Sequence, residues 1–167
     1  MKYFPEHQII DWFTQICLAL KHIHNKKILH RDIKSGNIFL TINGLVKLGD
    51  FGIAKCLKSS LEKAKTVVGT PYYLSPEIIQ NLPYSFKSDI WSLGVLLYEM
   101  CCLKMPFDGN NIANLSLKII KGQYNPIPSF FSKELRGLIM NILNVDESKR
   151  PTIDEILSTN KIKQDII

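Results

Sequence analysis

The chain has 167 residues, of which 46% are hydrophobic and 22% charged, so it can bury the core of one globular domain and is not a disordered protein. Its net charge of +6 comes mostly from scattered lysines, which we interpret as a solubilising surface, with acidic peptides or other polyanions as the alternative. No nucleic-acid-binding motif accompanies this charge. The most apolar run, residues 90–103, is too short to cross a membrane and contains Glu99. We therefore expect no nucleic acid and no membrane among its partners.

The cysteines indicate a reducing compartment. None of the four forms a C-x-x-C pair, and no histidine completes a zinc-binding spacing with them. Cys101 and Cys102 are neighbours in the apolar run and are expected to be reduced core residues. The first residues lack the apolar segment of a signal peptide. We expect a cytoplasmic protein, with the nucleus as the alternative.

The first predicted element is a long helix. Proline followed by an acid at Pro5-Glu6 is typical of a helix start, and apolar residues then recur at helical spacing as far as about His24. These apolar residues are Ile9, Phe13, Ile16, Leu20 and Ile23. A short strand is expected at Ile28-Leu29, leading into His30.

A β-hairpin is predicted next. Two short apolar stretches flank Asn43-Gly44, which favours a type I′ turn because both residues tolerate positive φ. Such a hairpin places Asn37 beside Asp50, and Asp32 lies on the loop just before it. Two carboxylates and an amide in one place suit proton acceptance and the binding of a hard cation through oxygen atoms.

The rest of the sequence predicts one loop and several helices. The polar, lysine-rich segment 55–65 is expected to form a mobile loop. The long apolar run predicts a buried central helix that is capped by Ser88 or Asp89. Further helices are expected over 112–120 and 135–143, and a last one after the capping box Thr152–Glu155.

Two motifs stand on either side of the predicted hairpin. His30-Arg31-Asp32 is followed by Asn37 after four residues, and Asp50-Phe51-Gly52 comes after the hairpin. In order and spacing they resemble the H-R-D-x-x-x-x-N catalytic loop and the D-F-G metal-binding loop of eukaryotic protein kinases. Ser75-Pro76-Glu77 stands where kinases carry A-P-E, with serine in place of alanine. The resemblance covers essentially the whole chain.

Further runs resemble one kinase family in particular. The segments 30–35, 47–54 and 69–77 are similar to those of the NIMA-related (Nek) serine/threonine kinases. Lys34 and Thr70 stand where serine/threonine kinases carry them, which argues against tyrosine specificity.

The resemblance implies roles in phosphoryl transfer. Asp32 would accept the proton of the substrate hydroxyl, Lys34 would neutralise charge on the moving phosphoryl group, and the Thr70 hydroxyl would contact both of them. This chemistry depends mostly on positioning and charge neutralisation. The residues implied to bind ATP and Mg²⁺ are Lys34, Asn37, Phe39 and Asp50, with Asn37 and Asp50 as the metal ligands and Phe39 below the adenine ring.

Structural roles follow from the same resemblance. His30 and Phe51 would pack beneath the site, and Asp89 would tie the central helix to the backbone of the catalytic loop. Glu77 and Arg150 would form a buried ion pair.

Thr66 is the implied activating phosphorylation site, because it lies between Asp50-Phe51-Gly52 and Ser75-Pro76-Glu77, where kinases place that residue. Its phosphate would pair with Arg31 and Lys55. The competing sites are Ser59, Ser60 and Thr70.

The expected fold is mainly α with a short β-hairpin. It corresponds to a protein-kinase-like C-terminal lobe over residues 1–167, without the β-rich N-terminal lobe. No G-x-G-x-x-G loop, no V-A-I-K strand and no adenine-binding hinge occur in the sequence. We expect a catalytic-lobe part that uses ATP, Mg²⁺ and protein Ser/Thr substrates once an N-lobe completes it, and that is inactive alone. The alternative is a non-catalytic docking module. By family resemblance, a cytoskeletal, centrosomal or ciliary location is also considered.

Overall fold

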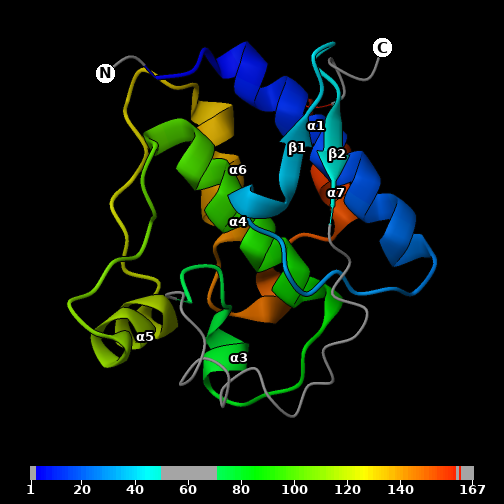
Figure 1. The fold of residues 1–167 in the computed structure, drawn as a ribbon. Coiled ribbons are helices and arrows are strands. Elements are labelled where there is room, and N and C mark those ends of the chain that lie inside the picture. The colour runs from blue at the N-terminus through cyan, green and yellow to red at the C-terminus, as the bar shows by residue number, and fades with distance from the viewer. Residues whose placement is uncertain (1–2, 50–70, 161, 163–167) are drawn as a thin grey trace.

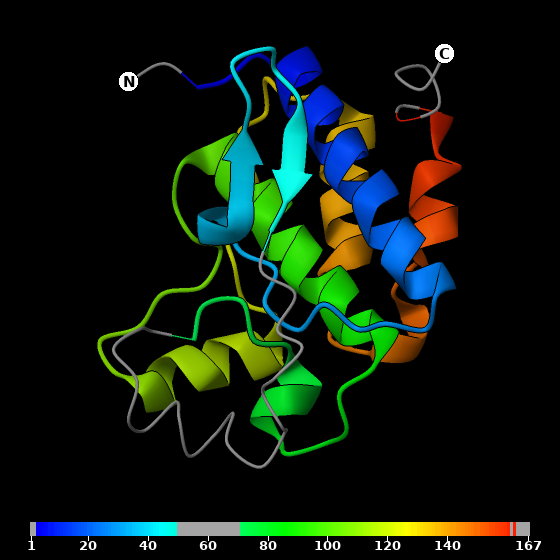
Figure 2. The same cartoon turned by 45° about the vertical axis from the view of Figure 1, so that its right-hand side comes forward.

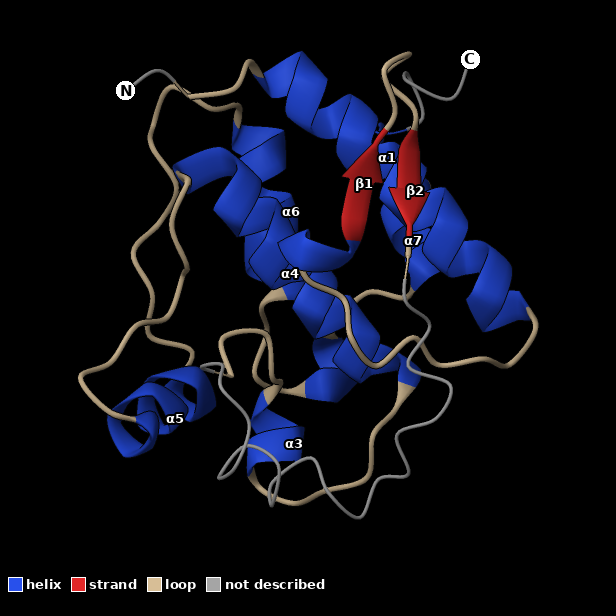
Figure 3. Cartoon of the chain, in the orientation of Figure 1, coloured by secondary structure: helices blue, strands red, loops and turns tan. Residues whose placement is uncertain are grey.

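The computed structural model describes residues 3–49, 71–160 and 162, and the described chain is mainly helical with one two-stranded antiparallel sheet (Figures 1 and 3). The fold class predicted at this coarse level, mainly α with a short hairpin, is confirmed. The elements are α1 (Glu6–Asn25), η1 (Ser35–Asn37), β1 (Ile38–Leu40), β2 (Val46–Leu48), α3 (Pro76–Ile79), α4 (Phe86–Cys102), α5 (Ile112–Lys121), α6 (Lys133–Ile142), η3 (Glu147–Lys149) and α7 (Ile153–Leu157).

Helix α4 is the central element of the core. Every residue from Ser88 to Tyr98 is buried, because the helix is apolar around most of its circumference and is covered on several sides. Helices α1 and α6 pack against it, and α7 packs on α1 (Figure 2). Helices α3 and α5 contact each other at one end of the molecule. The prediction of a buried central helix is confirmed.

The cap of α4 differs from the prediction. Ser85 is the N-cap, and its side chain accepts a hydrogen bond from the amide of Lys87. Ser88 completes a capping box, since its hydroxyl accepts from the amide of Ser85 at 3.2 Å. The helix thus begins before Ser88 and Asp89, which lie inside it. Ser85 takes the cap because its hydroxyl is equally suited to this position and it comes earlier in the chain.

The turn of the hairpin also differs. The amide of Gly44 donates to the carbonyl of Thr41 at 3.0 Å, and the amide of Thr41 donates to the carbonyl of Leu45 at 2.9 Å. These bonds close a three-residue loop in which Gly44 has a φ of 78° and Asn43 is not in the left-handed region. A type I′ turn needs positive φ at both central residues, so the predicted turn type is wrong and the three-residue loop with a left-handed glycine replaces it.

The hairpin is fixed to α1. Strand β2 packs along this helix, and the amide of Val46 donates to Oε1 of Gln15 at 2.8 Å. Ile38 pairs with Leu48 at the other end of the ladder, and the amide of Gly49 donates to the carbonyl of Asn37 at 2.9 Å. Asn37 and Gly49, the residues next to the two strands at this end, therefore lie side by side.

The expected strand at Ile28-Leu29 is absent from the described chain. Helix α1 instead ends in a Schellman motif, in which Lys27 has a φ of 61°, its amide donates to His24 and the amide of Ile28 donates to Ile23. The backbone amides of Lys27 and Ile28 are therefore bonded to carbonyls of the helix end and are not available to pair with a neighbouring strand.

The remaining helix predictions are confirmed. Helices α1, α5 and α6 lie where the apolar spacing places them, and α7 follows a capping box between Thr152 and Glu155. Among the described residues, no helix combines the length and apolarity needed to cross a membrane, and no group of three acidic, histidine or cysteine side chains is arranged to hold a metal.

Candidate active site

Three of the predicted site residues lie together at the start of the hairpin. Nζ of Lys34 is 3.1 Å from Oδ2 of Asp32, and Nδ2 of Asn37 donates to the same oxygen at 3.0 Å. Nδ2 of Asn37 also donates to the backbone carbonyl of Asp32 at 2.7 Å. The side chains of Lys34 and Asp32 are 43% and 39% exposed, whereas Asn37 is buried. The carboxylate is thus held from two sides and still faces solvent.

The short turn η1 produces this arrangement. Lys34 is extended, and the amide of Asn37 then donates back to the carbonyl of Lys34 at 3.0 Å. The backbone reverses direction within three residues, so the side chain of Asn37 returns to the backbone of Asp32. Both hydrogen bonds use Nδ2, which leaves Oδ1 as the oxygen that suits a hard cation.

Asp89 anchors the loop that carries Asp32. Its Oδ2 accepts from the amide of His30 and its Oδ1 from the amide of Arg31, both at 2.9 Å, as expected for the tie between α4 and the catalytic loop. Oδ2 also lies 2.9 Å from Nε2 of His24, and Oδ1 accepts from the hydroxyl of Tyr84 at 2.6 Å. Burial alone would raise the pKa of Asp89, but these hydrogen bonds outweigh it and lower the pKa.

His30 and Phe39 both lie against the backbone at Gly49. His30 is fully buried, and its Nε2 lies 3.1 Å from the carbonyl oxygen of Gly49. Phe39 is 54% exposed, and its ring lies so close to Gly49 that a Cβ placed there would be 2.5 Å from Cε2. His30 is therefore placed beneath the loop, and Phe39 presents an aromatic face to solvent.

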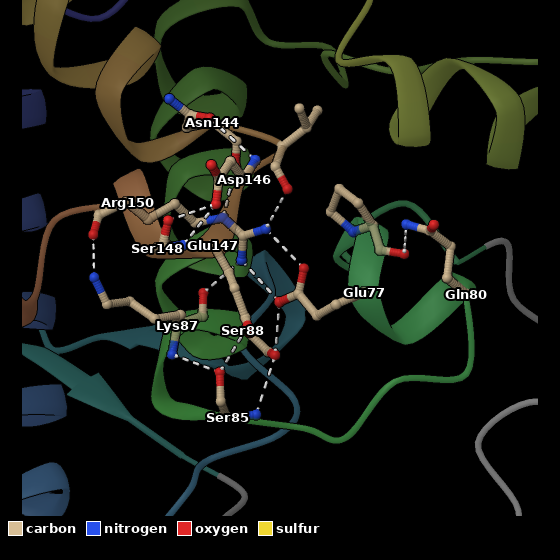
Figure 4. Close-up of polar contacts among 12 residues, drawn as sticks. Glu77, Gln80, Ser85, Lys87, Ser88, Asn144, Asp146, Glu147, Ser148 and Arg150 are labelled. Atoms are coloured by element: carbon tan, nitrogen blue, oxygen red, sulfur yellow. Dashed lines mark hydrogen bonds and ion pairs between the residues drawn. The ribbon is translucent and has the colours of Figure 1, made fainter.

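Glu77 and Arg150 form the expected buried ion pair. The two guanidinium nitrogens donate to the two carboxylate oxygens at 2.8 and 2.7 Å, and Ser88 donates to Oε1 of Glu77 at 2.8 Å (Figure 4). Nε of Arg150 donates to the carbonyl of Asn144, and its Cζ lies 5.0 Å from the ring centroid of Trp91. Burial favours a raised pKa for Glu77, but the hydrogen bonds and charge of Arg150 lower it.

Several predicted residues lie outside the described residues. These are Asp50, Phe51, Lys55, Ser59, Ser60, Thr66 and Thr70. The structure therefore brings together Asp32, Lys34 and Asn37, and it places Gly49, the neighbour of Asp50, beside Asn37.

Sequence reasoning missed two sets of polar contacts. The first joins His24 and Tyr84 to Asp89. The second joins Glu99, which we noted only as a charge in an apolar run, to the hydroxyls of Tyr73 and Ser35. The signal was present, because a carboxylate inside an apolar helix needs a partner, but the sequence does not say which distant hydroxyl supplies it.

Comparison with known proteins agrees with this arrangement. The family model described as protein kinase domain matches residues 1–161. The chain is 55% identical over 163 residues to serine/threonine-protein kinase Nek1 of Mus musculus, covering 98% of the chain and 14% of that protein. It is 59% identical over 155 residues to serine/threonine-protein kinase Nek5 of Homo sapiens, covering 92% of the chain and 22% of that protein.

A more distant organism gives the same result. The chain is 54% identical over 167 residues to probable serine/threonine-protein kinase nek3 of Dictyostelium discoideum, covering 98% of the chain and 15% of that protein. In each of these three comparisons the chain spans less than a quarter of the relative's length. The chain belongs to the protein kinase family, and its similarity is to the Nek serine/threonine kinases.

Proposed function

We propose that this chain is the C-terminal lobe of a serine/threonine protein kinase, which transfers the γ-phosphoryl group of ATP to a serine or threonine of another protein. One observation carries the proposal: the half-exposed carboxylate of Asp32 is held by Lys34 and Asn37 within hydrogen-bond distance. A carboxylate that is fixed in this way and open to solvent can accept the proton of an incoming hydroxyl.

The residues of the chain then have separate tasks. Asp32 orients the substrate hydroxyl and accepts its proton. Lys34 places a positive charge where negative charge moves from the attacking oxygen to the phosphoryl group. Phe39 offers an exposed ring on which the adenine of ATP can rest.

Magnesium would be held at the base of the hairpin. The carboxamide oxygen of Asn37 and the carboxylate of Asp50 are the ligand types that Mg²⁺ prefers. When bound, Mg²⁺ supplies charge neutralisation on the phosphate oxygens. The fit of this site to Mg²⁺ is supported by Asn37, because its side-chain nitrogen donates to Asp32 and its side-chain oxygen is therefore the atom that can face a cation.

The loop that covers the phosphates, the strand lysine and the adenine hinge are not among the 167 residues. We therefore propose that an N-terminal lobe outside this sequence supplies them, and that residues 1–167 alone do not transfer phosphate at a measurable rate.

We further propose a cytoplasmic site of action, with the nucleus or the cytoskeleton, centrosome or cilium as alternatives. Imaging of a tagged full-length protein would test the location.

The decisive experiment compares four proteins: residues 1–167, the same residues joined to the N-terminal lobe of a Nek kinase, and that completed protein with either Asp32→Asn or Asp50→Asn. We expect phosphate transfer to a Ser/Thr peptide only from the completed wild type. Asp32→Asn should lower kcat by about 10²–10⁴-fold, because it removes the proton acceptor, with little change in ATP affinity. Asp50→Asn is the matched comparison and should weaken Mg·ATP binding as well. Equal binding defects in the two variants, or activity of residues 1–167, would contradict the proposal.

Thr66 is proposed as the activating phosphorylation site of the completed kinase. A phosphate would bring a charge of about −1.5 to −2 near Arg31 and Lys55 and order the segment around it. Phosphosite mapping with a Thr66→Ala variant tests this. Full activity without phosphate at Thr66 would exclude it.

A further inference from the structure

Three residues from separate parts of the chain form a closed set of hydrogen bonds beside the candidate catalytic residues. Ser35 belongs to η1, Tyr73 follows the undescribed segment, and Glu99 lies on α4. Tyr73 donates its hydroxyl to Oε2 of Glu99, and Ser35 donates its hydroxyl to Oε1 at 3.2 Å. The amide of Ser35 donates to the hydroxyl oxygen of Tyr73 at 3.3 Å.

The proton inventory of this set is complete. Each hydroxyl has one proton, which can go to a different oxygen of one carboxylate, and Oγ of Ser35 also lies 3.1 Å from the hydroxyl oxygen of Tyr73. The oxygen of Tyr73 then remains free to accept the amide of Ser35, a donor at the N-terminus of η1 that has no partner within the turn. Burial and the hydrogen bond to Glu99 raise the pKa of Tyr73 to about 12, so its hydroxyl stays a donor at neutral pH.

Ser35 is the member of this set that touches the catalytic loop. It follows Lys34 directly and begins the turn that ends at Asn37. Its two donors, Oγ and the backbone amide, both point at groups held by α4. Fixing the first residue of a three-residue turn fixes the direction in which Lys34 and Asn37 leave it, because so short a turn has few other conformations.

We infer that Ser35 is a positioning residue for phosphoryl transfer: with Tyr73 and Glu99 it holds η1, and through η1 it sets the approach of Lys34 and Asn37 to Asp32. The inference rests on the proposed function and adds to it an exposed residue whose hydrogen bonds go to Tyr73 and Glu99 rather than to Asp32. Because Ser35 is exposed, it contributes little to the core, so its removal should change the turn and not the fold.

The test uses the completed kinase with Ser35→Ala, Ser35→Thr and, as a matched control, Ser158→Ala. Ser158 is exposed, and among the described residues its hydroxyl donates to the carbonyl of Asp154 in the helix that it ends. We expect Ser35→Ala to lower kcat about three- to tenfold with an unchanged KM for ATP, and Ser35→Thr to restore it. Ser158→Ala should match wild type in kcat, and all three variants should keep their Tm within about 2 °C.

A double-variant cycle separates positioning from a general surface effect. Ser35→Ala should lower kcat in the wild-type background but by less than about twofold in Glu99→Ala, because the carboxylate that accepts the Ser35 and Tyr73 hydroxyls is already absent there. Equal losses in the two backgrounds, or a wild-type kcat in Ser35→Ala, would overturn the inference while leaving the proposed function intact.

Residues 1–167 provide a readout that does not need activity. The amide of Asn37 should exchange with solvent faster in Ser35→Ala than in Ser158→Ala, since the turn that protects it has lost its anchor. If the completed kinase proves inactive, the proposed function fails, and this exchange measurement still decides the inference. Identical exchange at Asn37 in both variants would reject it.

Discussion

Arg31 shows how the candidate site is held at the level of single residues. Its φ of 70° lies in the left-handed region, which costs a residue with a side chain about 1–2 kcal/mol. Asp89 offsets this cost, because it accepts the amides of both His30 and Arg31 and is itself buried and further bonded by His24. The strained conformation immediately before Asp32 thus depends on one carboxylate of the central helix.

Replacing that carboxylate with an amide of the same shape should be costly. We expect Asp89→Asn to lower the free energy of unfolding by about 2–3 kcal/mol. Both carboxylate oxygens of Asp89 accept hydrogen bonds, from two backbone amides and two side chains, whereas an amide side chain can accept only at its single oxygen. Urea unfolding at pH 7, followed by circular dichroism, measures the change. Asp108→Asn is the control, since Asp108 is exposed and forms an ion pair with Lys118 in the described part of the chain, and its unfolding midpoint should stay close to wild type. Equal stability of the two variants would contradict the role given to Asp89.

At the scale of elements, spacing and caps were readable from the sequence where they depend on neighbours in the chain. The apolar period predicts α1, α5 and α6, and Thr152 with Glu155 predicts the start of α7. The predictions of the hairpin turn and of the α4 cap were wrong, because in both places the local sequence fits two alternative structures. Asn43-Gly44 fits a two-residue or a three-residue loop, and both Ser85 and Ser88 can cap α4.

The candidate site was predictable to a different extent. The residue types alone indicated proton acceptance and cation binding near Asp32 and Asn37, and the kinase resemblance added their separate roles. The resemblance also gave the pairing of Glu77 with Arg150, which are 73 residues apart. No periodicity indicates a contact of that length. The bonds of His24 to Asp89 and of Ser35 to Glu99 span 65 and 64 residues, and only the packed structure reveals them.

The contact between α4 and α6 gives a prediction at the same scale. A Cβ on Gly94 would lie 2.3 Å from Cγ2 of Ile142, in a part of the core where both helices are buried. Gly94→Ala should therefore push the helices apart and lower the free energy of unfolding by about 1–3 kcal/mol. Gly137→Ala on α6 is the control, because nothing lies within 4 Å of a Cβ there.

The two glycine variants should change stability in opposite directions. Gly137→Ala should raise the free energy of unfolding by up to about 1 kcal/mol, through its better helix propensity. Urea unfolding of both variants decides the matter. A stabilising effect of Gly94→Ala would show that α4 and α6 do not approach each other as closely as described.

At the scale of the whole molecule, Arg150 connects parts that are distant in the chain. Its guanidinium joins α3 through Glu77 and the loop after α6 through Asn144 (Figure 4). It also lies over the ring of Trp91 on the central helix. The arginine is buried, so its charge must be balanced where it lies. This need makes the ion pair a condition for the α3 segment to dock on α4.

The ion pair also sets how the stability of the molecule depends on pH. The pKa of Glu77 in the folded state is lowered from its ordinary value of 4.5, so the pair stabilises the protein above about pH 4.5 and this stabilisation is lost as the pH falls through the folded pKa. Glu77→Ala leaves Arg150 buried without its counter-ion and should cost about 3–5 kcal/mol at pH 7. Unfolding curves between pH 7 and pH 3 should show a steep loss of stability in the wild type and a shallower loss in Glu77→Ala, because the variant has one fewer carboxylate to protonate. Parallel pH profiles for the two proteins would mean that Glu77 does not carry this linkage, and Asp89, whose pKa is also lowered, would be the next carboxylate to replace.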